Sequence, residues 1–127
     1  MIVVDTSALV AIALDEPIAD QCQAALDAET EVSISAGTLA EALIVAEMRG
    51  VRAGMNKLIE GLDLEVLVVT KSAAERVAEA YRRWGKGAHP ASLNLGDCYA
   101  YEAAERQNCR LLFVGNDFSK TDLVSVL

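Results

Sequence analysis

The chain has 127 residues, close to the commonest length of one domain and long enough to bury about two-thirds of its unfolded surface. Its composition is 53% apolar with only two prolines, which excludes a disordered chain. The net charge of −8 argues against a protein that binds nucleic acid through bulk positive potential. We therefore expect a single globular domain that spans residues 1–127.

The chain termini, apolar runs and cysteines bear on its location. Met1 leads directly into a strand-like run, without the cationic leader of a signal peptide, and the longest apolar runs are too short to span a bilayer. Cys22, Cys98 and Cys109 form no CxxC pair, and the lone His89 has no zinc-binding spacing. We expect a soluble cytoplasmic protein with no membrane partner, in which the cysteines are small apolar residues and His89 is a loop residue.

Predicted strands and helices alternate along the chain. The first helix is expected to be capped by Thr6 or Ser7 and the second to open at Pro17. This alternation favours a parallel sheet with helices on both faces. In chain order, the sequence predicts strand 2–4, helix 8–14, helix 17–28, strand 32–35, helix 38–49, helix 51–61, strand 65–69, helix 71–84, loop 85–92, helix 97–107, strand 111–114 and strand 123–126.

Helix 71–84 has an apolar stripe and a local excess of positive charge. The stripe, which we expect to face the core, consists of Ala73, Val77, Tyr81 and Trp84. Residues 71–90 hold five bases and two acids, the only stretch with such an excess. The charges alone favour a solvated helix face. A positive border that guides a nucleic-acid strand is the alternative interpretation.

Four carboxylates follow predicted strands or open predicted helices: Asp5, Glu41, Asp97 and Asp117. Ligands of an open parallel sheet bind beyond the carboxyl ends of its strands, so acids far apart in the sequence can converge there. Hard divalent cations such as Mg²⁺ take oxygen ligands of this kind. The pattern therefore predicts a cation site.

Each acid also has a structural explanation. Thr38 and Glu41 have the spacing of a capping box, which taken singly is the favoured interpretation of Glu41. Asp97 can meet a helix dipole, and Asp117 can be a turn residue. Asp5 differs, because an isolated acid at the end of a buried strand is costly unless it is paired or binds a cation. One shared cation explains all four acids together, so we favour the metal site.

Four ordered motifs together span the whole chain. They are Val4-Asp5-Thr6-Ser7-Ala8-Leu9, Ala40-Glu41-Ala42, segments 85–91 with 93–98, and segments 112–118 with 120–123. In this order they resemble the opening motif, the second acidic motif, the loop with the third acidic motif, and the closing motif of the PIN-domain ribonucleases. Among these proteins the resemblance is to the VapC-type toxins of bacterial toxin–antitoxin pairs, and the loop and third motif resemble those of one VapC subgroup.

The resemblance implies a three-layer α/β/α fold with a parallel sheet in the order 3-2-1-4-5. It assigns the four acids as the catalytic and metal-binding residues for Mg²⁺ or Mn²⁺, with Asp5 and Asp97 as direct ligands and Glu41 and Asp117 acting directly or through water. Four neighbouring polar residues would orient these carboxylates by hydrogen bonds. They are Thr6, Ser7, Asn116 and, as a fifth acid or a turn residue, Asp122.

The implied function is that of a toxin. Such an enzyme hydrolyses phosphodiester bonds of tRNA, rRNA or mRNA, and it inhibits translation and growth until a cognate antitoxin neutralises it. A homodimer is expected as well. The alternatives are a free-standing PIN nuclease of RNA processing and a non-catalytic binding module. A phospho-receiver domain would need an acidic pair where Val3-Val4 precedes Asp5, and a haloacid-dehalogenase-type phosphatase would need an acid at Ser7.

Overall fold

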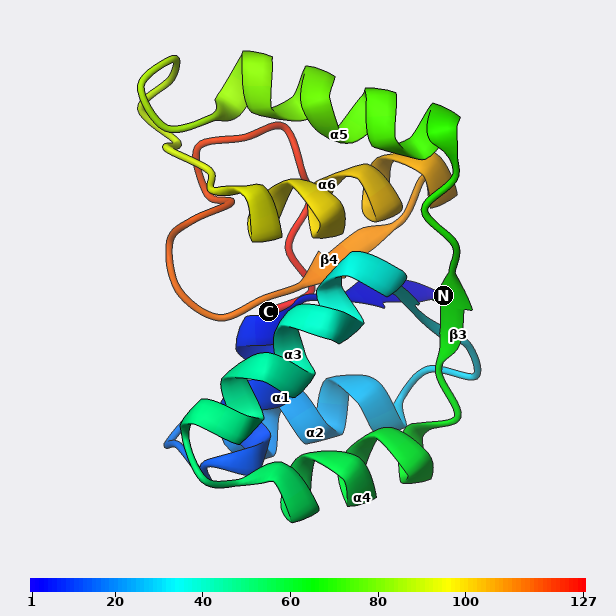
Figure 1. Ribbon diagram of the computed structural model, residues 1–127. Helices are drawn as coiled ribbons and strands as arrows, with labels where there is room; N and C mark the ends of the chain where they lie inside the picture. Colours follow the sequence, from blue (N-terminus) through cyan, green and yellow to red (C-terminus); the bar gives the residue numbers. More distant parts are fainter.

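The computed structural model describes all 127 residues, which form four strands and six helices (Figure 1). The predicted alternation is confirmed, with small shifts at the ends of elements. In chain order the elements are β1 (Ile2–Val4), α1 (Thr6–Ala13), α2 (Ala19–Asp27), β2 (Val32–Ser35), α3 (Ala36–Met48), α4 (Arg52–Leu62), β3 (Glu65–Leu67), α5 (Lys71–Trp84), α6 (Leu95–Gln107) and β4 (Arg110–Leu112).

The sheet is parallel and has the order β3-β2-β1-β4, so the α/β/α prediction is confirmed but the prediction of five strands is wrong. Segment 123–126 makes only an isolated bridge, between Ser125 and Leu111 of β4. The backbone of Leu111 donates to Val124 and accepts from Val126, both at 3.1 Å, and the pairing extends no further. The fifth position of the sheet is therefore occupied by a single bridge.

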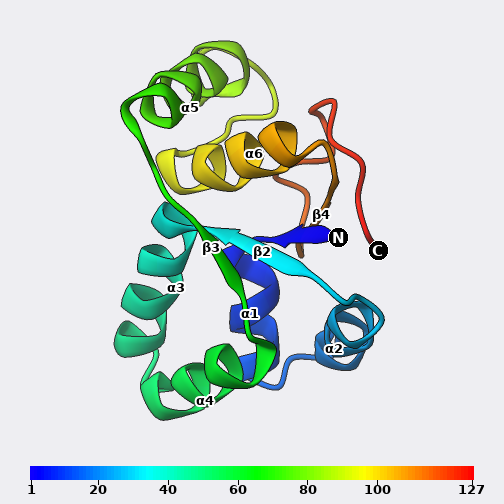
Figure 2. The same ribbon diagram turned by 90° about the vertical axis from the view of Figure 1, so that its right-hand side faces the viewer.

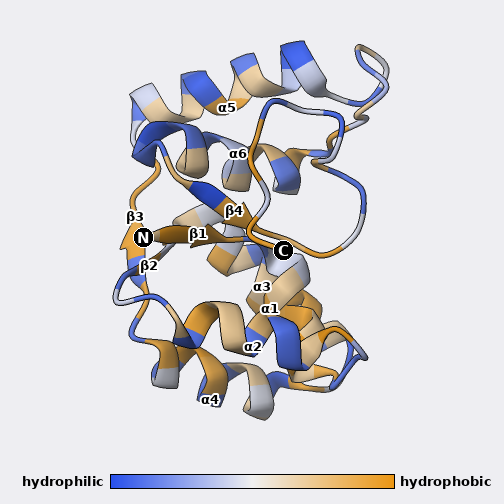
Figure 3. Ribbon diagram, turned by 180° about the vertical axis from the view of Figure 1, so that it is seen from behind, coloured by the Kyte–Doolittle hydropathy of each residue, from blue (hydrophilic) through white to orange (hydrophobic).

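The sheet lies between two helical layers. Helices α5 and α6 cover one face, and α1 to α4 lie on the other (Figure 2). Alternate residues of β1 face opposite layers because strand side chains alternate. Val3 packs in the cluster that contains Tyr101 of α6, whereas Ile2 and Val4 pack with Leu9 of α1. Figure 3 shows β1 as hydrophobic, as expected for a strand covered on both faces.

The buried stripe of α5 differs from the prediction at one position. Ala73, Val77 and Ala80 are buried and Trp84 is half-buried, whereas the Tyr81 side chain is 41% exposed. At 100° per residue, Ala80 continues the line from Ala73 and Val77 more closely than Tyr81 does. The spacing of the predicted stripe favoured Tyr81, but the neighbouring Ala80 occupies the core position.

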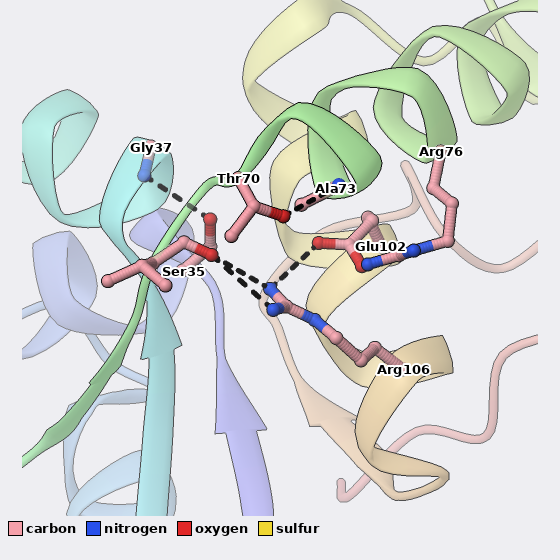
Figure 4. Close-up of polar contacts among 8 residues, drawn as sticks. Ser35, Gly37, Thr70, Ala73, Arg76, Glu102 and Arg106 are labelled. Atoms are coloured by element: carbon pink, nitrogen blue, oxygen red, sulfur yellow. Dashed lines mark hydrogen bonds and ion pairs between the residues drawn. The ribbon is translucent and has the colours of Figure 1, made fainter.

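A buried carboxylate joins α5, α6 and the segment after β3. The Glu102 side chain is 1% exposed and accepts hydrogen bonds from Arg76 Nε at 3.1 Å and Arg106 Nη2 at 3.0 Å (Figure 4). Arg106 also donates to the carbonyl of Val68 at 3.4 Å. A buried charge of this kind is tolerated because both partners compensate it.

The cysteines and the histidine occupy structural positions. Cys22 and Cys98 are buried, Cys109 is half-buried, and all three are free thiols. His89 lies in the loop between α5 and α6, where its Nδ1 accepts the backbone N–H of Ala91 at 3.0 Å. The interpretation of His89 as a loop residue is thus confirmed. No helix combines the length and apolar character needed to cross a membrane.

Candidate active site

The candidate site lies at the switch point of the sheet, where the carboxyl ends of the neighbouring strands β1 and β4 lie side by side. Asp5 directly follows β1, and its backbone N–H donates to the carbonyl of Leu112 at 2.9 Å. Asp117 lies in the turn that follows β4, and Asp97 lies in the first turn of α6. Glu41 projects from α3, which follows β2. Four segments distant in the sequence thus supply the acids.

Asp5 is 4% exposed and caps α1, so the prediction that Thr6 or Ser7 caps this helix is wrong. Thr6 is already helical, whereas Asp5 is extended and its Oδ2 accepts the Ser7 backbone N–H at 3.1 Å. The other oxygen, Oδ1, is buried and has no hydrogen-bond partner. Burial raises the pKa of Asp5 to about 6, against the hydrogen bonds of Ser7, and the charge of Glu41 raises it further. A cation at Oδ1 would relieve this cost.

Hydroxyl groups of α1 hold two of the acids. Ser7 Oγ donates to Asp5 Oδ2 at 2.7 Å and accepts the backbone N–H of Val114 at 2.9 Å. Thr6 Oγ1 donates to Glu41 Oε1 at 2.6 Å. These contacts fix both carboxylates relative to α1.

The other two residues expected to assist the site are differently placed. The side chain of Asn116 makes no hydrogen bond, and the backbone carbonyl of this residue accepts the Ser119 hydroxyl at 2.7 Å. Asp122 accepts the hydroxyl of Tyr101 at 2.7 Å and pairs with Arg83 at 3.8 Å. Asp122 therefore fastens the C-terminal segment to α5 and α6.

The predicted capping box at Glu41 is wrong. Helix α3 begins at Ala36 with Ser35 as its cap, whose Oγ accepts the Gly37 N–H at 3.2 Å. Thr38 lies inside the helix, and its buried Oγ1 has no partner. Ser35 ends β2 and is itself a good capping residue, so the helix starts earlier than Thr38 suggests. The carboxylate of Glu41 is left free of any capping role.

A capping box occurs at Asp97 instead, and the spacing of Asn94 and Asp97 in the sequence could have revealed it. The Asp97 N–H donates to Asn94 Oδ1 at 2.8 Å, and the Asn94 N–H donates to Asp97 Oδ2 at 3.0 Å. Burial raises the pKa of Asp97 to about 7, although the hydrogen bond from Asn94 opposes this shift. The charges of Asp5, Asp117 and Glu41 also raise this pKa, so Asp97 lies within electrostatic range of the other three acids.

The donor set suits a hard cation. The acids offer only carboxylate oxygens, which Mg²⁺ and Mn²⁺ accept. The unpaired Oδ1 of Asp5 is the clearest sign of fit, whereas Asp117 is exposed in its turn. No three acidic, histidine or cysteine side chains lie close enough to hold a metal ion as they stand.

The three arginines of α5 pair with acids within the fold, whereas Lys71 makes no ion pair. Arg76 pairs with the buried Glu102, and Arg82 pairs with Glu79 on the same helix. Arg83 pairs with Glu105 at 4.0 Å and with Asp122 at 3.8 Å. This pairing favours a solvated, internally paired helix face over a border that attracts a nucleic-acid strand.

The PIN domain model matches residues 2–124 of the chain. The chain belongs to the PIN domain family. Among similar PIN proteins, Ribonuclease VapC30 of Mycobacterium tuberculosis is 38% identical over 127 residues, covering 98% of this chain and 97% of the relative. Ribonuclease VapC36 of the same species is 42% identical over 125 residues, covering 95% and 90% respectively. The resemblance to VapC-type PIN ribonucleases is confirmed.

Solved PIN structures have the same fold. The crystal structure of Mycobacterium tuberculosis VapC20, described as a Sarcin-Ricin loop cleaving toxin, is similar with a TM-score of 0.80 and 17% identity, covering 98% of this chain and 97% of that chain. A chain of a toxin–antitoxin complex from Klebsiella pneumoniae gives a TM-score of 0.74 at 17% identity, covering 100% and 98%.

Proposed function

We propose that this PIN protein is a metal-dependent endoribonuclease and the toxin of a type II toxin–antitoxin pair, with Asp5, Glu41, Asp97 and Asp117 as its active-site acids. The observation that carries the proposal is the buried, unpaired Oδ1 of Asp5 in the company of three further acids. Such an arrangement is costly without a cation and useful with one. The naming of similar relatives as ribonucleases supports RNA as the substrate.

In this proposal Asp5 and Asp97 bind Mg²⁺ or Mn²⁺, and Glu41 and Asp117 complete the site directly or through water. A bound divalent ion would supply charge stabilisation at the scissile phosphate and lower the pKa of a water nucleophile. Ser7 and Thr6 keep the carboxylates of Asp5 and Glu41 in place. Without a cation the four negative charges repel phosphate, so RNA binding depends on the metal.

The proposed substrates are tRNA, rRNA or mRNA, and cleavage of any of them arrests translation. We accordingly propose a cytoplasmic location, where these RNAs take part in translation. Cleavage of purified RNA in Mg²⁺ or Mn²⁺, and its loss in EDTA, tests the metal dependence. Asp97→Asn keeps an oxygen for the capping bond with Asn94 but loses the charge, so we expect an intact fold without cleavage. Asp20→Asn, at an exposed acid of α2, is the matched control and should cleave normally.

We also propose that a cognate antitoxin covers the site, inserting an arginine or lysine among the four acids. A cationic side chain competes with the metal for the same carboxylates, and the net charge of −8 suits a basic partner segment. Similarity of fold to a chain of a toxin–antitoxin complex supports this partner. Co-expression with the neighbouring gene product should restore growth and suppress cleavage. A complex that cleaves RNA as fast as the free chain contradicts the toxin–antitoxin proposal and leaves a free-standing PIN nuclease.

A homodimer is the further assembly that we propose. A groove of about 520 Å³ between α5 and α6 is lined only by apolar side chains, including Tyr81 and Leu95, which are 41% and 59% exposed. Exposed apolar surfaces of this kind mark interaction sites. Leu95→Glu should shift the mass measured by light scattering towards the monomer, whereas Val124→Glu, at another exposed apolar residue, should not. An unchanged mass for Leu95→Glu contradicts this interface.

A further inference from the structure

The glycine at position 96 is not explained by its backbone conformation. Gly96 is the second residue of α6 and has no positive φ, and alanine is the better helix former. A Cβ atom at Gly54, inside α4, would have nothing within 4 Å. At Gly96 a Cβ atom would lie 2.0 Å from Oε2 and 2.6 Å from Cδ of Glu41. A methyl group at position 96 would therefore overlap the carboxylate of Glu41, which fills the space that glycine leaves.

The other oxygen of the same carboxylate accepts a hydrogen bond from α1. Thr6 is 7% exposed, and its Oγ1 donates to Glu41 Oε1 at 2.6 Å. The carboxylate of Glu41 is thus fixed between α1 and α6. Thr6 directly follows Asp5 and Gly96 directly precedes Asp97, so these two contacts bring Glu41 next to the acids of both helices.

A second close contact between α3 and α6 lies one helical turn away from Glu41 and Gly96. The ring of Tyr99 lies against the backbone of Gly37, where a Cβ atom would be 2.4 Å from the ring Cγ. Gly37 and Glu41 are four residues apart on α3, and Gly96 and Tyr99 are three apart on α6, so the two contacts lie on facing stripes. The packing of Tyr99 on Gly37 therefore fixes the distance between α3 and α6 near Gly96.

We propose that Gly96 and Thr6 are positioning residues, which set the carboxylate of Glu41 so that it reaches a divalent cation bound by Asp5 and Asp97. This inference rests on the proposed metal-dependent function. A methyl group at position 96 displaces the Glu41 carboxylate and breaks its bond with Thr6. Because that carboxylate is the free end of a flexible side chain, the fold accommodates the displacement. The loss therefore falls on metal affinity and not on folding.

The test uses the full chain and measures Mn²⁺ binding by calorimetry together with the melting temperature in EDTA. Gly96→Ala should weaken Mn²⁺ binding by about 10- to 100-fold, the usual effect of removing a residue that orients a ligand. Its melting temperature in EDTA should stay within a few degrees of the wild type. Gly54→Ala is the matched control, since it adds the same methyl group to a helix in open space, and it should bind Mn²⁺ normally. Thr6→Val removes the hydroxyl that donates to Glu41 and also contacts the Thr38 carbonyl, and it should weaken binding as well.

A second pair of variants shows whether Gly96 acts through Glu41. In a Glu41→Ala background the added methyl group meets no carboxylate, so Gly96→Ala should leave the residual Mn²⁺ affinity unchanged. An equal loss in both backgrounds, or wild-type affinity in Gly96→Ala alone, overturns the inference while the proposed function stands. Failure of the wild-type chain to bind Mn²⁺ overturns the proposed function itself.

Discussion

Ser7 holds one oxygen of Asp5 and leaves the other unpaired. The Ser7 hydroxyl donates to Asp5 Oδ2 at 2.7 Å while Oδ1 is buried without a partner. The same hydroxyl accepts the backbone N–H of Val114, so it also ties Asp5 to the segment that leads from β4 to Asp117. The carboxylate is therefore oriented but not neutralised, which is the condition expected of a cation ligand.

Asp5→Asn should abolish RNA cleavage and growth inhibition and leave the fold intact. The amide keeps an oxygen for the Ser7 bonds but removes the charge that a cation needs. Loss of a buried charge should also maintain or raise the melting temperature in EDTA at pH 8. Cleavage assays in Mg²⁺ with a thermal melt of the same sample check this. Wild-type cleavage by Asp5→Asn would remove this residue from the active site.

Ser7→Ala should shift the pH dependence of cleavage. The hydrogen bonds of Ser7 lower the pKa of Asp5, which burial raises to about 6. Without the hydroxyl the pKa should rise further, so activity should require a more alkaline pH, by roughly one unit. The measurement is a pH profile of kcat/KM, with Ser72→Ala on the exposed face of α5 as the control. An unchanged profile contradicts the proposed orientation of Asp5 by Ser7.

Glu41→Gln separates the active site from helix capping. Since Ser35 caps α3, the amide should leave the melting temperature unchanged and reduce cleavage strongly. Ser35→Ala is the complementary variant and should lower the free energy of unfolding by about 1 kcal/mol. Full activity with reduced stability in Glu41→Gln would return this residue to a structural role.

The metal-free protein should become less stable as the pH rises from about 4 to 8. The pKa values of Asp5 and Asp97 are raised to about 6 and about 7, so folding disfavours their charged forms. The stability that the protonated carboxyl groups contribute is fully present below their pKa in the unfolded chain. It is lost as the pH rises through their pKa in the folded protein. For Asp5, a shift from 3.8 to about 6 corresponds to about 3 kcal/mol. Denaturant melts in EDTA at several pH values measure this loss. Mn²⁺ should stabilise the protein more at pH 8 than at pH 5, and a pH-independent effect contradicts metal binding by these acids.

Glu102→Ala should destabilise the fold by about 3 kcal/mol, because it leaves the guanidinium groups of Arg76 and Arg106 without their buried partner. The exposed pair of Glu79 and Arg82 provides the control, and Glu79→Ala should destabilise the fold far less. Urea unfolding gives both values. Equal costs would show that the buried carboxylate contributes no more than a surface pair.

The sequence by itself determined the alternation of elements, the parallel sheet, the VapC-type PIN family and the four acids as candidates. Periodicity, turn residues and short motifs are local properties, so they can be recognised in the sequence alone. Local spacing also misled, because it assigned the capping box to Thr38 and Glu41 when a better capping residue, Ser35, ended the preceding strand.

Only the tertiary structure decided which residues that are distant in the sequence come into contact. The contact between Gly96 and Glu41 joins residues of two helices, and the pairing of Arg76 with Glu102 compensates part of the positive charge of residues 71–90. The fifth strand shrinks to one bridge at Ser125, because pairing depends on the neighbouring strand as well as on the segment itself. Burial of the Asp5 carboxylate likewise depends on packing between β1, α1 and the segment after β4. Each of these outcomes depends on groups that are far apart in the sequence and come close together only when the chain folds.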